Sequence, residues 1–251
     1  MNNLRANTLS ICAVDLATGE AGVAVASRCL AAGGIVPFAA VGVGAIATQA
    51  VADMSFGPRG LELLKAGKSA AETVNQLISR DETGTAADAK WIEYYRGEQL
   101  SDEGVDFSKE PDGRIRWFTR RIRQLGIVDA QGRAAVHSGA RIFPWFGSRT
   151  GPGFCCQGNM LAGPQVVDAM YETFERRRSS GAPLVRGLFD ALAAGEAAGG
   201  DKRGKQAAGI LVVKPGAHWM NSERWCDLRV DDHAEPVKEL ERILKKGGYL
   251  D

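Results

Sequence analysis

The sequence TLSICAVDLATGEAGVAVASR, residues 8–28, contains the clearest structural pattern in the chain. Apolar residues alternate in the run that begins at Thr8, and again around Val23 and Val25, with the spacing of two that is typical of a strand buried on one face. The segment from Asp15 to Gly22 lies between the two runs and supplies turn-forming residues. We therefore predict a hairpin of two antiparallel strands whose first residue is Thr8.

Thr8 has two interpretations at this position. Threonine is β-branched and favours strands, so a structural role explains it without further assumptions. If residues 1–7 were absent, Thr8 would combine a hydroxyl nucleophile with a free α-amine that can act as its general base. Residues 1–7 are then either a leader removed by self-cleavage between Asn7 and Thr8, or an overlong start.

Composition limits the function classes. A chain of 251 residues that is 45% hydrophobic and 24% charged can bury a sizeable core. Its 31 basic and 30 acidic residues give a net charge of +1, which does not indicate nucleic-acid binding. No internal repeat or low-complexity linker divides the sequence, so we predict a single domain over residues 1–251.

Cysteines and apolar runs indicate the compartment. The five cysteines are an odd number and include the adjacent pair Cys155 and Cys156, which does not suggest a disulfide framework and favours the reducing cytoplasm. No signal peptide core or membrane-spanning stretch is present in the sequence, so we expect a soluble protein without a membrane partner. The three histidines lack metal-ligand spacing, and we predict no metal and no cofactor.

The rest of the chain combines strand-like and helix-like patterns. Ser69, with Glu72 three residues later, has the spacing of a capping box and predicts the start of a helix. Residues 126–137 are typical of a second hairpin that turns at Gln131 and Gly132. Apolar spacing predicts a buried strand at 207–213 and helices at 61–64, 70–78, 161–178, 184–194 and 236–246. Without strict strand–helix–strand alternation, this order favours an α+β fold over a doubly wound sheet.

Several sequence blocks together resemble a known bacterial family, domain of unknown function 1028. They are TLSI at 8–11, GVAVASR at 22–28, AIATQ at 45–49, GPRGLELL at 57–64, QLGIVD at 124–129, QGNMLAG at 157–163, GEAAGGDKRGKQ at 195–206 and DLRVDDH at 227–233. The family is placed with the Ntn-hydrolases, enzymes with an N-terminal Thr, Ser or Cys nucleophile. The resemblance implies a four-layer αββα sandwich, in which two stacked antiparallel sheets lie between helices.

The resemblance also implies a mechanism in which the Thr8 hydroxyl attacks a carbonyl, the α-amine takes the proton, and a nearby donor stabilises the oxyanion. We predict Asn159 as that donor, and the alternative is that Asn159 caps a helix beginning at Leu161. The related proteasome-type hydrolases carry Asp before the Ser-Arg pair, where this chain has Ala26. No lysine occurs before Lys65 either, so the sequence does not support a proteasome-like activation scheme.

Candidate substrate-binding residues lie at strand ends and in one polar cluster. The cluster precedes the strand at 207–213, and a guanidinium within it could bind a substrate carboxylate, although a solvated loop is the more usual role of such residues. Polar groups at strand ends could instead satisfy turns. The predicted set comprises Ser27, Arg28, Thr48, Gln49, Glu196, Asp201, Arg203 and Gln206.

Members of the resembled family pass quickly from a helix to the strand at 124–129, whereas this chain has an insertion at 84–118. Aromatic residues in a polar insertion anchor it to its own domain or to a second subunit, and a lid over the site is the alternative. We predict a homodimer or higher homo-oligomer to which the insertion contributes. The aromatic residues are Trp91, Tyr94, Tyr95, Phe107, Trp117 and Phe118.

These observations lead to three functional hypotheses. The first is a cytoplasmic hydrolase of a small-molecule amide-type C–N bond that uses Thr8 after its exposure. The second is a non-catalytic small-molecule-binding or assembly protein on an Ntn scaffold, since a fold alone does not establish chemistry. The third is an imine or ring C–N hydrolase, or deaminase, that activates water at Asp201. A chain that keeps residues 1–7 while active on a small amide excludes the first hypothesis. Thermal stabilisation by a ligand that survives Thr8→Ala, without any turnover, favours the second, and loss of activity in Asp201→Asn but not in Thr8→Ala favours the third.

Overall fold

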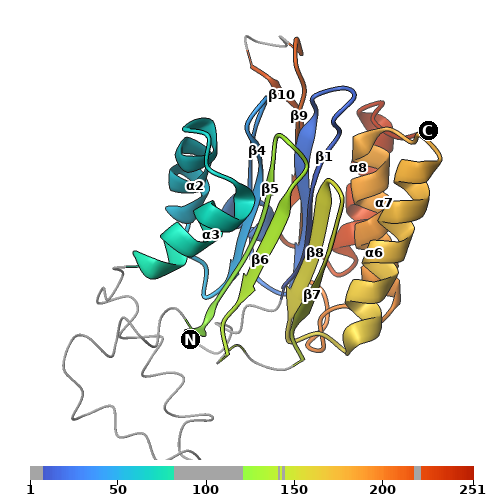
Figure 1. Cartoon of the computed structure of the whole chain (residues 1–251). Helices are drawn as coiled ribbons and strands as arrows, with labels where there is room; N and C mark the ends of the chain where they lie inside the picture. Colours follow the sequence, from blue (N-terminus) through green and yellow to red (C-terminus); the bar gives the residue numbers. More distant parts are fainter. Residues whose placement is uncertain (1–7, 82–120, 141, 143–144, 218–221) are drawn as a thin grey trace, which may run out of the picture.

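The structure, a computed structural model of the chain, describes residues 8–81, 121–140, 142, 145–217 and 222–251. Two antiparallel sheets are stacked face to face, and helices cover the outer face of each sheet (Figure 1). The chain therefore has an α+β fold that forms a four-layer αββα sandwich, as the resemblance implied. The predicted insertion at 84–118 lies outside the described residues.

The predicted hairpin forms the centre of the larger sheet. Strand β1, Thr8–Val14, pairs with β2, Ala21–Ser27, so that Thr8 lies opposite Ser27. The turn between them is held by Asp15, whose Oδ1 accepts hydrogen bonds from the backbone N–H groups of Ala17 and Thr18 at 2.8 and 3.3 Å. Such side-chain acceptance is the usual role of Asp in a turn. The local sequence thus determines both the hairpin and the position of Thr8 at its open end.

The two sheets have different sizes and orders. The six-stranded sheet has the order β10-β9-β2-β1-β8-β7 and the four-stranded sheet the order β3-β4-β5-β6. On its other side β1 pairs with β8, which places Thr8 opposite Asn159. The remaining strands are β3 Pro37–Ala40, β4 Gly44–Ala50, β5 Arg123–Asp129, β6 Ala134–Ser138, β7 Gly147–Gly151, β8 Phe154–Asn159, β9 Ala207–Val213 and β10 Arg224–Val230.

Helices cover the sheets in two groups. Helices α2, Phe56–Lys65, and α3, Ala70–Ser79, lie on the four-stranded sheet (Figure 1). Helices α6, Pro164–Ser179, α7, Leu184–Ala197, and α8, Pro236–Lys246, lie on the six-stranded sheet (Figure 1). A short helix, α1, spans Ala32–Ile35. None of the helices in the described ranges is long and apolar enough to cross a membrane.

Two helices start at other residues than predicted. The helix expected at 61–64 begins already at Phe56. The helix expected from Leu161 begins at Pro164, and its N-cap residue is Gly163. Proline is favoured in the first turn, where its missing N–H has no intrahelical partner. Asn159 is the last residue of β8 and does not cap α6, so the capping alternative for Asn159 is excluded.

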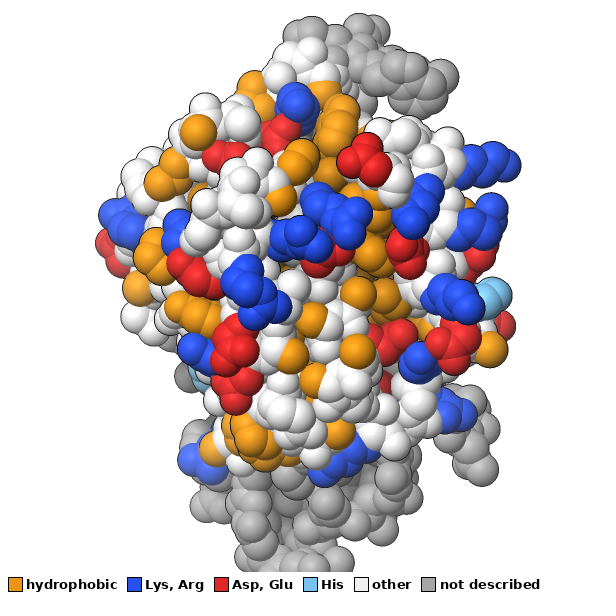
Figure 2. Space-filling model, turned by 90° about the vertical axis from the view of Figure 1, so that its right-hand side faces the viewer, with side chains coloured by type: hydrophobic (Ala, Val, Ile, Leu, Met, Phe, Trp, Pro, Cys, Tyr) orange, Lys and Arg blue, Asp and Glu red, His pale blue; other side chains and the backbone are white. Residues whose placement is uncertain are grey.

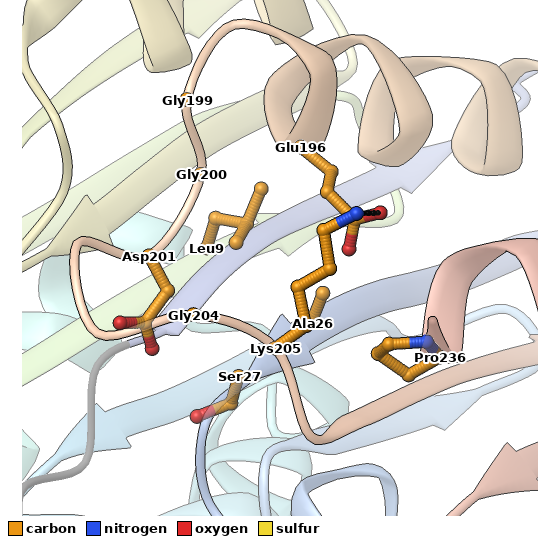
Figure 3. A pocket seen from close by; sticks show the side chains of 10 residues that line it. All are labelled: Leu9, Ala26, Ser27, Glu196, Gly199, Gly200, Asp201, Gly204, Lys205 and Pro236. Carbon is orange, nitrogen blue, oxygen red and sulfur yellow. Dashed lines mark ion pairs between the residues drawn. The ribbon is translucent and has the colours of Figure 1, made fainter. Parts of the chain in front are cut away.

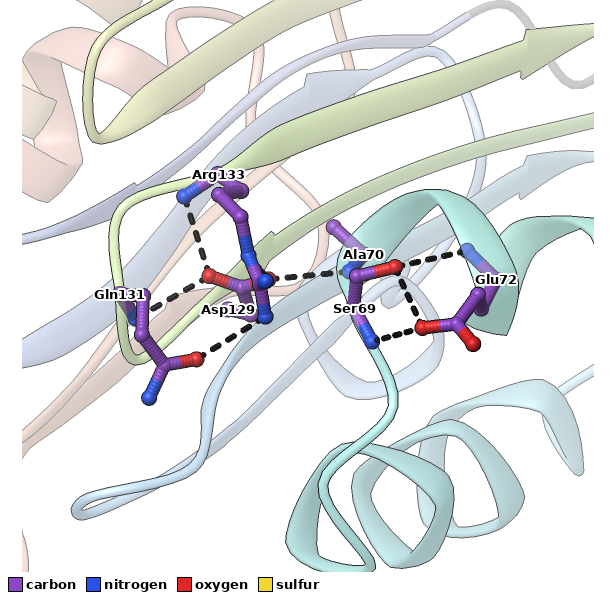
Figure 4. A network of polar contacts seen from close by, with 6 residues as sticks. All are labelled: Ser69, Ala70, Glu72, Asp129, Gln131 and Arg133. Atoms are coloured by element: carbon purple, nitrogen blue, oxygen red, sulfur yellow. Dashed lines mark hydrogen bonds and ion pairs between the residues drawn. The ribbon is translucent and has the colours of Figure 1, made fainter.

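The predicted capping box at the start of α3 is confirmed and is tied to the neighbouring sheet (Figure 4). The Ser69 Oγ accepts from the Glu72 backbone N–H at 3.2 Å, and the Glu72 carboxylate accepts from the Ser69 backbone N–H at 2.8 Å. The buried carboxylate of Asp129 then accepts from the backbone N–H of Ala70 at 3.0 Å and from the Arg133 side chain at 2.7 Å. Asp129 therefore joins the β5–β6 turn to the first residue of α3.

Basic residues on the face covered by α6, α7 and α8 are interspersed with acidic ones (Figure 2). The arginine run at 176–178 contributes to this mixture. Arg177 pairs with Asp190 of α7 at 2.5 Å, and Arg178 pairs with Glu175 at 2.7 Å. This face therefore carries no extended field of one sign.

The core has three parts, and strand alternation assigns side chains to them. Leu9 and Ile11 pack toward α6 and α7, whereas Cys12 and Val14 pack between the sheets. A third apolar cluster lies between the four-stranded sheet and helices α2 and α3. Because side chains alternate along a strand, Thr8 and Ser10 face the space between the sheets together with Cys12. That space is apolar along most of its length and polar at the Thr8 end.

Candidate functional site

A group of buried polar side chains fills the space between the sheets at the Thr8 end. Each member listed here is at most 2% exposed. The larger sheet contributes residues from β1, β2 and β8, and the smaller sheet contributes residues from β4 and β5. The members are Thr8, Ser10, Ser27, Gln49, Gln124, Gln157 and Asn159.

Thr8 is held by contacts from both sheets. Its Oγ1 lies 3.2 Å from the Oγ of Ser27. Its backbone carbonyl accepts a long hydrogen bond of 3.5 Å from Nε2 of Gln49 on the opposite sheet. Asn159 is its cross-strand neighbour. The structure thus brings together four residues that the sequence nominated for one site.

Gln124 connects these residues to one another. Its Oε1 accepts from Nε2 of Gln49 at 2.7 Å and from Nδ2 of Asn159 at 2.9 Å. Gln49 in turn accepts from the hydroxyl of Ser10 at 2.6 Å, and Ser10 accepts from Nε2 of Gln157 at 2.8 Å. We call Ser10, Gln49, Gln124, Gln157 and Asn159 the amide network. It links the strand that carries Thr8 to the opposite sheet.

Ser10, Gln124 and Gln157 also belong to this buried polar group, although the sequence did not nominate them. A signal for them was present in the alternation, because Ser10 follows Thr8 at a spacing of two and Gln157 precedes Asn159 at the same spacing. Residues at that spacing share one face of a strand. A polar side chain on an otherwise apolar inner face is therefore the feature that could have nominated them.

A cavity of about 160 Å³ lies beside Ser27, on the face of the sheet that α7 covers (Figure 3). Leu9 and Ala26 line it from the sheet. Glu196 and Lys205 also line it and form an ion pair of 3.1 Å (Figure 3). Desolvation by burial raises the pKa of Glu196, and the hydrogen bond from Lys205 opposes that shift. The cavity and the Thr8 contact therefore share Ser27 while opening on different faces of the sheet.

The loop that follows α7 is fastened to the end of β2 by Asp201. The Asp201 carboxylate accepts from the backbone N–H of Arg28 at 3.0 Å and from the backbone N–H of Arg203 at 2.8 Å. The Arg203 side chain also pairs with Asp201 at 3.2 Å, and the Arg28 guanidinium donates to the Arg203 carbonyl. Burial lowers the pKa of Arg203. Its Nε is buried without a hydrogen-bond acceptor in the described part of the chain.

Two nominated substrate-binding residues lie apart from this site. Thr48 donates to the backbone carbonyl of Asp53 at 3.1 Å. It shares its strand face with Ile46, which packs toward α2 and α3, so it points away from Gln49. Gln206 donates to Asp232 at 3.1 Å on the exposed side of the loop. Within the described ranges, no group of three or more His, Cys, Asp or Glu is placed to hold a metal ion.

Comparison with known proteins identifies the family. A family model described as a family of unknown function, DUF1028, matches residues 8–97 and 116–240, so its match begins at Thr8. A crystal structure of a Silicibacter pomeroyi protein, described as DUF1028, is similar with 28% sequence identity and a TM-score of 0.72. The similarity covers 98% of this chain and 91% of that one. No curated protein matches the chain. The chain belongs to the DUF1028 family.

Proposed function

We propose that the protein hydrolyses an amide-type C–N bond of a small molecule, with Thr8 as an N-terminal nucleophile after cleavage of the Asn7–Thr8 bond. The observation that carries this proposal is the environment of Thr8. The residue opens a strand, its hydroxyl lies 3.2 Å from that of Ser27, and Asn159 is its cross-strand neighbour. A hydroxyl, a hydrogen-bonding partner and an amide donor are thus placed together.

The chemistry requires the α-amine of Thr8. In the uncleaved chain this nitrogen is an amide and is not basic. Attack of the Thr8 hydroxyl on the Asn7 carbonyl moves the acyl group from nitrogen to oxygen, and water then hydrolyses the ester and releases residues 1–7 with the amine free. In the reaction with substrate, the amine accepts the hydroxyl proton as the Oγ1–carbon bond forms, and returns it to the leaving nitrogen as the C–N bond breaks. Water then hydrolyses the acyl-enzyme.

Ser27 and Asn159 have separate roles in this scheme. The Ser27 hydroxyl orients the Thr8 hydroxyl through their contact. The Nδ2 of Asn159 donates to the oxygen that becomes negative when the carbonyl is attacked. Such preorganised donors contribute about 10²–10³-fold to the rate of acyl transfer. Both roles need only residues that the hairpin and β8 already hold in register.

Two observations bear on the alternative functions. Thr8 is only 2% exposed in the uncleaved chain, which favours the non-catalytic binding protein as the second candidate. Asp201 accepts two backbone N–H bonds and one guanidinium bond, which favours a fastening role over activation of water for a C–N hydrolase or deaminase.

The decisive experiment combines intact-mass measurement with acylation by a small β-lactone. We expect the purified protein to lack residues 1–7 and to gain one adduct on Thr8. Thr8→Ala should retain residues 1–7 and gain no adduct, whereas Thr150→Ala, an exposed threonine of β7, should behave as the wild type. A protein that retains residues 1–7 while hydrolysing a small amide would exclude this mechanism.

A further inference from the structure

We propose that Gln124 is a positioning residue of the Thr8 site, because it sets the direction in which Gln49 and Asn159 present their amide N–H groups. The proposal rests on the proposed function, in which Thr8 is the nucleophile. Gln124 belongs to β5 of the smaller sheet and is 1% exposed. It acts on the reaction only through its two neighbours.

The Gln124 side chain uses its full hydrogen-bonding capacity. Its Oε1 accepts from Gln49 at 2.7 Å and from Asn159 at 2.9 Å. Its Nε2 donates to the Ser138 hydroxyl and to the Gly158 backbone carbonyl, both at 2.9 Å. A side-chain amide has two acceptor positions on oxygen and two donor hydrogens on nitrogen, so each is occupied.

One of these four bonds determines the direction of all the others. The two ends of a side-chain amide have nearly the same shape, and a glutamine or asparagine can be placed either way round. The Gly158 carbonyl can only accept, so it requires the nitrogen end of Gln124. The oxygen end then faces Gln49 and Asn159, and both must turn their nitrogen atoms toward it. The backbone carbonyl of Gly158 thereby fixes which way round Gln124 lies, and the backbone carbonyl of Thr8 favours the same direction of Gln49.

This polarity matters at Thr8. The same Gln49 nitrogen lies 3.5 Å from the Thr8 carbonyl and holds the strand end in place. An amide nitrogen carries two hydrogens, so Asn159 can donate one to Gln124 and the other to an oxyanion at Thr8. If Asn159 were reversed, its carbonyl oxygen would face the oxyanion and repel it. Gln124 therefore decides whether Asn159 stabilises or opposes the reaction.

The substitution Gln124→Glu tests this with pH. When protonated, the introduced carboxyl can donate to Gly158 and accept from Gln49 and Asn159, so the wild-type polarity persists. When ionised, it still accepts from Gln49 and Asn159, but it has no hydrogen for the Gly158 carbonyl and repels it. The carboxylate then moves away from β8 and draws the Asn159 amide out of its wild-type position. Burial raises the pKa of a carboxyl, so this ionisation lies above the usual carboxyl range. The rate of Thr8 acylation by the β-lactone, divided by the wild-type rate at the same pH, should fall up to about 10²-fold as the pH rises through that pKa.

Two further variants separate positioning from folding. Gln124→Leu removes, at every pH, the acceptor toward which Asn159 turns its amide nitrogen. The acylation rate of this variant, divided by the wild-type rate at the same pH, should therefore be low and independent of pH. Gln131→Glu is the same isosteric change on an exposed turn, and its ratio should stay near one. Thermal unfolding of each variant checks that the compared proteins are folded. A Gln124→Glu ratio that does not change with pH in a folded protein overturns the proposal.

Failure of the proposed function would look different. In that case the wild-type protein takes no adduct on Thr8 at any pH. The effect of residue 124 on Asn159 is then measured from the side-chain NH₂ signals of Asn159 in ¹H–¹⁵N spectra. These signals are assigned as the ones that disappear in Asn159→Asp. These signals should shift with pH in Gln124→Glu and stay constant in Gln131→Glu. Asn159 signals that do not respond to the introduced carboxyl would overturn the positioning inference alone.

Discussion

Gly126 lies where the Gln157 side chain crosses the space between the sheets. A Cβ added to Gly126 would lie 2.4 Å from Oε1 of Gln157, too close for either atom to remain in place. Gln157 would have to move away from Ser10, to which it donates at 2.8 Å. We expect Gly126→Ala to lower the free energy of unfolding by about 1–3 kcal/mol, because it leaves buried polar groups without partners. Urea denaturation measures this change.

A double-mutant cycle identifies the cause of that loss. In the background Gln157→Ala the crossing side chain is gone, so the methyl group added by Gly126→Ala has room. The second substitution should then cost less than it does in the wild type, with a coupling of at least about 0.5 kcal/mol. Additive effects would show that the methyl group meets something other than Gln157.

At the scale of one element, the Ser69–Glu72 capping box makes the stability of α3 depend on pH. Hydrogen bonds from the Ser69 backbone N–H, and next from its hydroxyl, lower the pKa of Glu72 below its ordinary value of 4.5. A carboxyl whose pKa is lower in the folded state stabilises the fold above the unfolded value, and this contribution is lost as the pH falls through the folded value. Wild type should therefore exceed Glu72→Gln in stability at neutral pH, and the difference should shrink below pH 4.5.

The test compares wild type with Glu72→Gln by urea denaturation, and repeats the comparison with both proteins also carrying Ser69→Ala. That substitution removes the N-cap oxygen and should lower stability by about 1 kcal/mol. It also removes one of the two hydrogen bonds that Ser69 donates to Glu72, so the pH-dependent part of the difference should become smaller. A difference between wild type and Glu72→Gln that persists unchanged at acid pH would assign it to something other than the carboxylate.

Local signals account for the elements that the sequence predicted. The Thr8–Arg28 hairpin, the Ser69 N-cap and the helix at 236–246 each follow from residues that are adjacent in the chain, and each is confirmed. The start of α6 was wrong because Leu161 has helical spacing but serves the core, where it is fully buried. Strand β10, at 224–230, went unpredicted although its apolar residues Cys226, Leu228 and Val230 have the spacing of two that is typical of a strand.

The residues of the candidate site could be predicted only in part, because the site is formed by two different sheets. Thr8, Ser27 and Asn159 lie at the ends of adjacent strands of one sheet, where the strand register brings them together. The sequence blocks that carry the family resemblance contain these three residues and Gln124 as well. Gln124 enters the site from the other sheet. Its partners are defined by how the two sheets stack, and no spacing along the chain encodes that stacking. The sequence therefore nominated Thr8, Ser27 and Asn159 and did not nominate Gln124.

For the whole molecule, the remaining prediction concerns association. The aromatic insertion at 84–118 lies outside the described residues, and the family match leaves out residues 98–115 within it. Trp91, Tyr94 and Trp117 are large apolar side chains within a polar stretch of sequence, and large apolar patches on proteins mark contacts. A closed two-fold dimer is the commonest assembly for such a patch. We expect sedimentation equilibrium to give a dimer or larger oligomer for the full chain, and weaker association when a short Gly/Ser loop replaces residues 84–118.

The same pair of proteins separates an interface from a lid. If the insertion covers the Thr8 site, the replaced chain should remain associated while the rate of β-lactone acylation at Thr8 changes. If it forms the interface, association should weaken while acylation at Thr8, measured under conditions where both proteins are folded, stays near the full-chain rate. A monomeric full chain, or a folded replacement that associates as strongly as the full chain, would remove the insertion from the interface. Because the two sheets and their polar end are built from residues outside 84–118, the replaced chain should retain the sandwich and so allow both measurements.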